Sequence, residues 1–427
     1  MSPAGLSADA PRPKRALWTT GPVPLVALAL LVPGHMYGWA LEWVWLGLQL
    51  FFGTLALVGG GRRITNTAGV PALVWACVFA AVTLSGCLSA FYGNAVVGLP
   101  LADGDIIDLV RLLLFIPLTF HMGSLLERRH VNSVVRLLKI SVLLNIGCSA
   151  ILLLDIHPFV DLVLGVYKDA KVQYAINHIR IGIPFANPNF AALLFSLMLA
   201  IFLFYRRSVF FASLTVAAIL ITGSRSGYLA IAPLLLLAYL LAILRAATSP
   251  KALILVIALH VFALIALNSV SELFGGFSRI NELSLALQGG DLGQVNTANI
   301  RFELIENARK YIEASPVLGV GAGRALGLDV VDSQVFSWPL NYGIPMAFIL
   351  YGLFLAPMGV IVYRAKEPVH RFAAIATALS FFLMLGTGDF MKNFRLFYLV
   401  LVMMHVMYLI ATPLGSEHAE ATLRFRP

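Results

Sequence analysis

The sequence predicts an all-α integral membrane protein, built as a bundle of about twelve transmembrane helices. Of its 427 residues, 59% are apolar and 12% are charged, and the mean hydropathy is +0.87. A soluble domain is roughly half apolar and about one quarter charged. Apolar runs of about 20 residues, the length with which a helix crosses a bilayer, recur along the whole chain. These observations exclude a soluble globular fold.

The apolar runs are separated by short polar loops, with one exception. They lie near residues 17–34, 38–59, 68–92, 106–126, 133–154, 185–205, 208–222, 226–246, 251–270, 338–363, 370–386 and 396–413. The exception is 271–337, the longest interval too polar to cross a bilayer, and we expect it to form short helices outside the membrane before the tenth span. The chain then divides into an N-terminal tail (1–16), a polytopic domain (17–413) that includes this segment, and a C-terminal tail (414–427).

Basic residues indicate the orientation of the spans. The two tails, the even-numbered loops and the inward end of the fifth span hold 18 of the 30 Lys and Arg residues, but only 5 of the 21 Asp and Glu residues. Because cytoplasmic loops are rich in Lys and Arg, we expect both termini to be cytoplasmic and the 271–337 segment to lie on the opposite side. The same distribution explains the net charge of +9 without a nucleic-acid surface.

The N-terminus and the cysteines add little. Basic residues precede the first apolar run and no small-residue cleavage site is evident, so we expect this run to be retained as a span. The three cysteines, Cys77, Cys87 and Cys148, all lie in apolar runs and indicate neither a disulfide framework nor a metal cluster.

The twelve other basic residues are not explained by topology. Several lie at span edges, where burying a charge costs a few kcal/mol unless it has a partner, so they are functional candidates. Four outward stretches concentrate them: 178–189, 222–227, the 271–337 segment and 389–395.

The stretch 178–189 begins with His178 and Arg180 and ends with Asn187-Pro-Asn189. Two prolines and two asparagines predict irregular backbone, which is tolerated at membrane depth only where it lines a cavity or is covered by protein.

The stretch 222–227 reads Thr-Gly-Ser-Arg-Ser-Gly and predicts a tight outward turn between two spans. Its small residues, Ser224 among them, let a ligand approach backbone N–H groups, and Arg225 supplies a planar fork of donors.

Within the 271–337 segment, residues 299–314 have the periodicity of an amphipathic helix. The apolar arc consists of Ile300, Leu304, Ile305, Ala308, Tyr311 and Ile312. Arg301 lies in the middle of this arc, so we expect a helix that lies on the membrane or on the bundle and holds Arg301 towards it. Thr297 or Asn299 is the expected cap.

A second helical pattern follows at the edge of the tenth span. Asp332, Val335, Phe336, Pro339, Leu340 and Gly343 share one face. This spacing places Asp332 at the outer end of the span, on the side of its apolar face.

The second half of the chain resembles the superfamily of O-antigen ligases and O-antigen (Wzy-type) polymerases. The resemblance is carried by the order of these residues: Arg180 ahead of Phe185-Ala-Asn187-Pro188-Asn189; Thr222-Gly-Ser-Arg225; Arg301 followed by Pro316-x-x-Gly319-x-Gly321; and Asp332-Ser333 ahead of Gly343-Ile344. The first half is similar in span count and hydropathy alone.

The resemblance implies transfer of a glycan from an undecaprenyl-diphosphate carrier at the periplasmic face of a bacterial inner membrane. Such a reaction uses a lipid-linked donor and acceptor, and it implies neither a metal nor a soluble cofactor. A chain-length regulator protein is a possible partner, and no nucleic acid is involved. The family's ligases place a His before the tenth span, where this chain has Asp332, so the polymerase reading is favoured over the ligase reading.

Breaking a sugar–diphosphate bond requires stabilisation of the charge that develops on the leaving group. Permanently charged, bidentate guanidinium groups suit this task, so Arg180, Arg225 and Arg301 are the candidates for it. The alternative is that these residues snorkel or pair with outward acids. Asp332 is the candidate base or orienting acceptor for the acceptor hydroxyl, with a helix cap as its alternative.

Further candidates for substrate binding are Asn187, Asn189, Ser224, Ser333, Trp338, Lys392, Arg395 and His178. Lys392 and Arg395 suit a lipid diphosphate or an anionic glycan, with contact to a phospholipid headgroup as the alternative. Trp338 suits sugar stacking or anchoring at the membrane interface. Asp103-Gly-Asp105 suits a turn better than a metal site. A twelve-span transporter or lipid-glycan flippase is a competing class, but the two halves of the chain show no repeat of the long polar segment.

Overall fold

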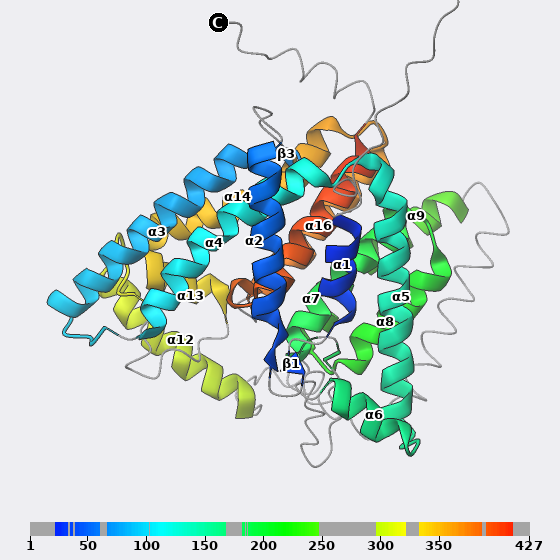
Figure 1. The fold of residues 1–427 in the computed structure, drawn as a ribbon, viewed down its shortest axis with the longest axis horizontal. Coiled ribbons are helices and arrows are strands. Elements are labelled where there is room, and N and C mark those ends of the chain that lie inside the picture. Colours follow the sequence, from blue (N-terminus) through cyan, green and yellow to red (C-terminus); the bar gives the residue numbers. More distant parts are fainter. Residues whose placement is uncertain are drawn as a thin grey trace, which may run out of the picture.

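The computed structural model describes most of the polytopic region as a bundle of helices (Figure 1). The described residues are 22–32, 35–36, 39–59, 66–101, 103–167, 182–183, 185, 187–246, 296–321, 333–386 and 390–412. Two short antiparallel hairpins, β1–β2 and β3–β4, are the sheets within these ranges. The all-α prediction is confirmed.

The elements follow one another along the chain with short connections. They are α1 (Pro22–Leu31), β1 (His35–Met36), β2 (Trp39–Ala40), α2 (Leu41–Gly59), β3 (Asn66–Thr67), β4 (Val70–Pro71), α3 (Ala72–Ala95), α4 (Asp103–Leu125), α5 (Arg128–Leu153), α6 (Phe159–Val166), α7 (Pro188–Ala200), the π-helix η2 (Ile201–Tyr205), α8 (Val209–Ile221), α9 (Arg225–Ala246), α12 (Asn296–Ala314), α13 (Gln334–Tyr342), α14 (Ile344–Arg364), α15 (Pro368–Leu385), the 3-10 turn η6 (Phe390–Lys392) and α16 (Phe394–Ala411).

Seven of the described helices are long and apolar enough to cross a membrane. They are 72–95, 128–153, 188–205, 226–244, 344–364, 368–385 and 394–411, and shorter apolar helices occupy 109–120 and 209–221. Every predicted apolar run coincides with a helix except 251–270, which lies outside the described residues. The multi-pass membrane class is therefore supported, whereas the count of twelve spans stays a prediction.

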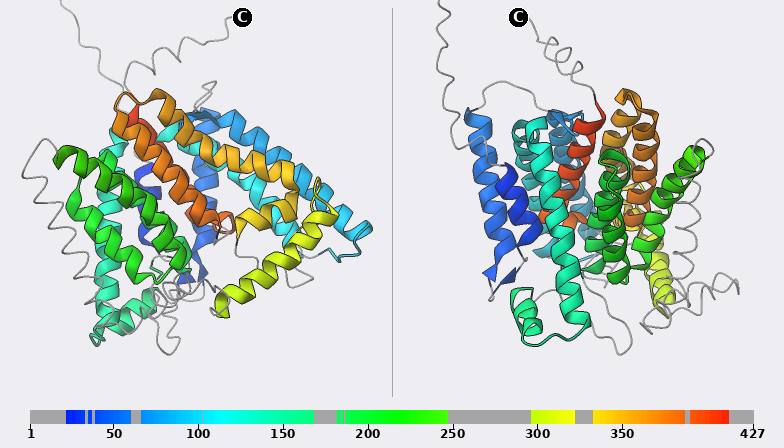
Figure 2. Two further views of the ribbon diagram at one scale, coloured as in Figure 1. Left: turned by 180° about the vertical axis from the view of Figure 1, so that it is seen from behind. Right: turned by 90° about the vertical axis from the view of Figure 1, so that its right-hand side faces the viewer.

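The core of the bundle forms around α16. In the span windows, 94% of α16 and 83% of the α7–η2 helix lie inside the protein, against 50% or less for the other five. Phenylalanines hold α16 to its neighbours: the Phe397 ring stacks on Phe115 of α4 with centroids 3.8 Å apart, and it meets Phe354 of α14 edge-on at 6.0 Å. Figures 1 and 2 show α16 near the middle of the molecule, enclosed by helices from both halves of the chain.

Several turns rich in basic residues meet at one end of the bundle, which we call the basic end. Arg207, after η2, forms an ion pair of 2.7 Å with Glu367, before α15. Arg206 donates to Asn132 of α5 at 2.8 Å, and Arg128 donates to the Thr412 carbonyl beyond α16. The α4–α5, η2–α8 and α14–α15 connections thus share one end with the end of α16, as alternating spans require.

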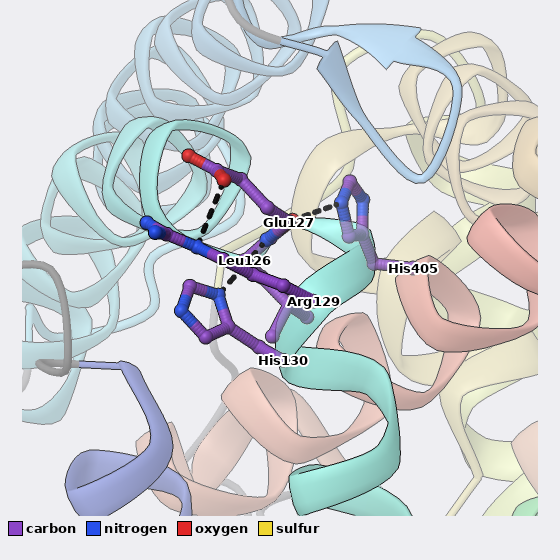
Figure 3. A network of polar contacts seen from close by, with 5 residues as sticks. All are labelled: Leu126, Glu127, Arg129, His130 and His405. Carbon is purple, nitrogen blue, oxygen red and sulfur yellow. Dashed lines mark hydrogen bonds and ion pairs between the residues drawn. The ribbon is translucent and has the colours of Figure 1, made fainter. Parts of the chain in front are cut away.

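A buried histidine ties further segments together at this end (Figure 3). His405 Nδ1 accepts from the Ala68 N–H in the β3–β4 turn at 2.6 Å, so Nε2 donates to the Leu126 carbonyl at 3.0 Å. Beside it, Glu127 caps α5 together with His130 and pairs with Arg129 at 3.0 Å. The β3–β4 hairpin is therefore anchored on α16 and on the α4–α5 turn.

Three local expectations need correction. The tenth run is not one helix, because Gly343 adopts φ +81° and ψ 160° and separates α13 from α14. Helix α12 begins at Asn296, so Thr297 and Asn299 lie inside it and do not cap it. Asp103-Gly-Asp105 forms the first turn of α4 and is not a loop. Acidic residues favour such a position because the N-terminal end of a helix carries partial positive charge.

Candidate functional site

Two of the sequence stretches selected above meet in the structure. The Ser224 hydroxyl donates to Asn189 Oδ1 at 2.8 Å, and both side chains are buried. Ser224 precedes α9 and Asn189 is the second residue of α7, so this hydrogen bond, between residues 35 positions apart in sequence, joins the N-terminal ends of two helices. We call this end of the bundle the site end.

Neutral side chains cap the helices at this end. Asn187 accepts from the Asn189 N–H at 2.8 Å at the start of α7, and Ser224 Oγ accepts from the Gly227 N–H at 3.2 Å at the start of α9. Ser226 lies 2.9 Å from Ser224, hydroxyl to hydroxyl. Because none of these caps carries a charge, the positive potential of both helix N-termini is not cancelled.

Gly227 explains why α7 and α9 approach so closely. A Cβ at this position would lie 2.8 Å from Cβ of Ala192 in α7. Arg225 is the first residue of α9 and follows Ser224 directly, so its backbone is fixed at the point where the two helices meet.

Arg395 lies at the same end but has partners within the protein. It is 3% exposed, its guanidinium lies 4.7 Å from the centroid of the Phe185 ring, and it donates to the Val32 carbonyl after α1. Asn393 caps α16 by accepting from the Leu396 N–H at 2.8 Å. Arg395 thus connects α16, the end of α1 and the segment that leads into α7, and its predicted contact with substrate remains untested.

Tyr167 adds a second contact at the end of α1. Its hydroxyl donates to the Leu31 carbonyl at 2.8 Å. Burial raises the pKa of Tyr167 to about 12, so the hydroxyl keeps its proton. The last carbonyls of a helix lack partners within it, and here Tyr167 and Arg395 bind two of them.

The Pro316-x-x-Gly319-x-Gly321 turn is built into the break between α13 and α14. Val320 N donates to Leu340 O at 2.7 Å, and Ile344 N donates to Pro316 O at 2.8 Å. Gly319 has φ +76°, and a Cβ there would lie 2.7 Å from the Gly343 nitrogen. Backbone therefore packs against backbone, which fixes residues 315–321 against the break between α13 and α14; we call these two helices the α13–α14 unit.

Helix α12 lies on this unit as the sequence predicts. Ala308 is fully buried with Val320 and Leu340, and Leu304, Tyr311 and Ile312 pack around them. The polar face, which includes Glu303, Glu306 and Lys310, is exposed. Arg309 pairs with Glu313 at 2.7 Å on that face, and position 301 lies two turns before Ala308 on the same side of the helix.

Three other predicted residues, Ser333, Trp338 and Lys392, lie in or next to α13 and η6. Ser333 directly precedes α13 and is buried, and its hydroxyl has no hydrogen-bond partner among the residues that the structure describes. Trp338 is 2% exposed and stacks on Tyr351 with centroids 4.9 Å apart. This packing is that of a core residue and does not match an anchor at the membrane interface. Lys392 ends η6.

Three predicted residues lie outside the described part of the chain. They are His178, Arg180 and Asp332. For Arg225, Arg301 and Lys392 the structure places the backbone, and their roles stay predictions.

Some residues of the site end were not selected from the sequence. Tyr167 is uncharged and belongs to none of the selected stretches, and Phe185 was quoted as part of a motif without a role, so only the fold relates these two residues to Arg395. Asn393 was recognisable, because Asn directly before an apolar helical run is a capping signal.

The fold and the site end define a multi-pass helical membrane protein in which polar motifs from the second half converge at one end of the bundle. Residues 209–365 match the family model described as O-Antigen ligase, and this range contains the 222–227 turn, α12 and the α13–α14 unit. The match confirms the resemblance to the superfamily of O-antigen ligases and polymerases, whose members are membrane glycosyltransferase-like enzymes. No curated protein matches the chain.

Proposed function

We propose that this protein polymerises undecaprenyl-diphosphate-linked repeat units of O-antigen or exopolysaccharide at the periplasmic face of the bacterial inner membrane. The observation that carries the proposal is the contact between Ser224 and Asn189, which brings two helix N-termini together beside the backbone of Arg225. A polyprenyl-diphosphate carrier presents an anion at the membrane surface, and helix N-termini bind anions.

In this proposal the donor diphosphate lies at the N-terminal ends of α7 and α9. As the bond between sugar and diphosphate breaks, negative charge grows on the leaving oxygen, and fixed donors stabilise it without having to reorganise. Arg225 begins α9, and Arg180 and Arg301 are assigned the same task. Neutral caps at Asn187 and Ser224 support this arrangement, because an Asp cap would repel the diphosphate.

The acceptor sugar is assigned to the region around Asp332. Its carboxylate takes the proton from the attacking hydroxyl, or orients that hydroxyl towards the donor sugar. The hydroxyls of Ser333 and of Ser337, one helical turn later, are buried and have no hydrogen-bond partner within the described part of the chain. Buried polar groups are rarely left unpaired, so a sugar hydroxyl is a fitting partner for them. Lys392 and His178 are assigned contacts with the anionic donor.

A ligase that transfers the glycan to lipid A core is the second candidate, since the matching family model carries the description O-Antigen ligase. Position 332 separates the two candidates, because ligases of this superfamily place a His where this chain has Asp332. We propose that the reaction needs no metal and that a chain-length regulator is a possible partner.

Reconstitution in vesicles with a labelled lipid-linked repeat unit tests the proposal. A polymerase lengthens the product and releases free carrier, and the activity resists EDTA. Transfer to added lipid A core would instead establish the ligase. Translocation of the lipid without a new glycosidic bond would overturn both.

Variants of two arginines on α12 test the leaving-group assignment. We expect Arg301→Lys to lower the transfer rate about 10²–10³-fold, the usual loss when one preorganised donor is removed from a developing anion. Arg309→Lys is the matched control, because Arg309 is exposed and pairs with Glu313, and we expect it to keep the wild-type rate. Equal rates for the two variants would remove Arg301 from the proposed chemistry.

A further inference from the structure

Three basic residues lie along the contact between α5 and α8 at the basic end, and we call them the basic cluster. Arg136 and Lys139 belong to α5, and Arg206 lies in the turn before α8, which packs against α5. Arg206 donates to Asn132 Oδ1 at 2.8 Å. Asn132, Arg136 and Lys139 follow one another at i, i+4 and i+7, so they lie along one face of α5.

The cluster lacks a counter-charge within the described part of the chain. Of the two carboxylates nearby, Glu127 pairs with Arg129 at 3.0 Å and Glu367 pairs with Arg207 at 2.7 Å. Within the described ranges, no carboxylate lies within salt-bridge distance of Arg136, Lys139 or Arg206. Arginines that do form ion pairs there include Arg129, Arg207 and Arg309. Arg136 and Arg206 are exposed.

The direction of α5 brings the charged ends of Arg136 and Lys139 closer to the depth of Arg206 in the membrane. Lys139 lies eleven residues into α5, about 16 Å from the helix start at the rise of a regular helix. Side chains of a helix lean towards its N-terminus, which for α5 is the basic end. The long stems of Arg136 and Lys139 therefore extend from the apolar layer back towards the headgroup layer. The Lys139 ammonium lies 4.7 Å from the Phe211 ring of α8.

Exposed apolar side chains continue from the cluster along both helices. On α5, Ile140 and Leu143 are 49% and 48% exposed and lie on the face of Arg136. On α8, Val209 and Phe210 are 65% and 64% exposed shortly after Arg206. A ligand that fits this surface has an anionic head at the membrane interface and acyl chains that run along the helices.

We propose that Arg136, Lys139 and Arg206 form a binding site for an anionic phospholipid of the leaflet at the basic end. The phosphate lies between the two guanidinium groups and the ammonium, and the chains cover Ile140 and Leu143. Basic groups between membrane helices bind such headgroups, each with about 1 kcal/mol, which corresponds to about fivefold in affinity. The site is separate from the proposed transfer reaction.

Native mass spectrometry of the purified full chain tests the site, with cardiolipin or phosphatidylcholine as the added lipid. Wild-type protein is expected to retain cardiolipin in preference to phosphatidylcholine. Arg136→Gln and Arg206→Gln are each expected to weaken cardiolipin retention about fivefold. Arg207→Gln is the matched control, since it removes the same charge from the next residue, whose partner is Glu367, and it is expected to retain cardiolipin as wild type does.

Two further arms separate the possible outcomes. Inorganic phosphate at millimolar concentration is expected not to displace the lipid, because the chains contribute to binding; displacement would show a simple phosphate site and overturn the proposal. Arg136→Lys preserves the charge and is expected to retain cardiolipin. Its retention would show that a substitution at position 136 is compatible with a folded protein. Equal losses of cardiolipin retention for Arg206→Gln and Arg207→Gln would show that retention depends on net charge alone, and would overturn the proposal.

Discussion

The two ends of the bundle are held together by different kinds of contact. At the basic end, charged side chains join turns that are distant in sequence, as in the Arg207–Glu367 pair and the contact of Arg128 with the Thr412 carbonyl. At the site end, apart from Arg395, the contacts described above between distant segments are neutral caps and close backbone contacts, as in the Asn189–Ser224 hydrogen bond. The difference shows that neutral contacts alone can join helix ends that are distant in sequence.

Physical chemistry accounts for the difference. A salt bridge between exposed side chains is screened by water and contributes little, whereas backbone that packs on backbone has no room to move. Neutral caps satisfy the first N–H groups of α7 and α9 and leave their positive potential in place. Disturbing the glycine contacts is therefore expected to lower the free energy of unfolding more than disturbing the ion pairs does.

The largest effect is expected at the α13–α14 break. Gly343 has φ +81° and ψ 160°, a backbone conformation essentially reserved for glycine, and a Cβ there would overlap the Val317 carbonyl. Gly343→Ala therefore combines backbone strain of about 1–3 kcal/mol with displacement of the 315–321 turn. We expect a loss of about 3 kcal/mol or more in unfolding free energy, measured by thermal unfolding in detergent.

The control for this variant lies on the same helix. A methyl group added at Gly352 or Gly359 of α14 would have nothing within 4 Å of it, and alanine is the better helix former by about 1 kcal/mol. Gly352→Ala and Gly359→Ala are therefore expected to match or exceed wild-type stability. A Gly343→Ala protein as stable as these controls would show that the turn and the break are not packed as described.

An intermediate effect is expected at Arg395, where the structure and the sequence favour different roles. Its position over Phe185 and its bond to Val32 O indicate a positioning residue. A desolvated cation–π contact is worth about 2 kcal/mol, so Arg395→Lys and Phe185→Leu are each expected to lower stability by about that amount. Their effects are expected to be non-additive in the double variant.

Kinetics then distinguish positioning from substrate binding. If Arg395 is a positioning residue, Arg395→Lys is expected to lower kcat through the alignment of α7 and to leave the KM for the proposed lipid-linked donor within about twofold. A direct bond to the diphosphate would instead raise KM by about tenfold or more, since charge-assisted hydrogen bonds contribute roughly 1.5–3 kcal/mol. That result would restore the role predicted from the sequence.

Features that depend on local sequence could be predicted, whereas features that depend on contacts between distant segments could not. Hydropathy located the helices, because a span must be apolar over about 20 residues, and periodicity identified α12 with Ala308 in its buried arc. The break at Gly343 was missed because glycine is common in membrane helices, and only its contact with the 315–321 turn requires the positive φ. Arg395 was recognised as unusual from its charge, but its partners Phe185 and Val32 come from distant segments.

The smallest effect is expected at the Arg207–Glu367 pair of the basic end. Both side chains are 55% exposed, so water and salt screen their attraction and the side chains lose entropy on pairing. A double-mutant cycle with Arg207→Gln and Glu367→Gln is expected to give a coupling energy of about 0–1 kcal/mol, which falls as ionic strength rises. Thermal unfolding at low and high salt measures both quantities. A coupling as large as the loss expected for Gly343→Ala would mean that ion pairs, and not close backbone packing, dominate the stability of the bundle ends.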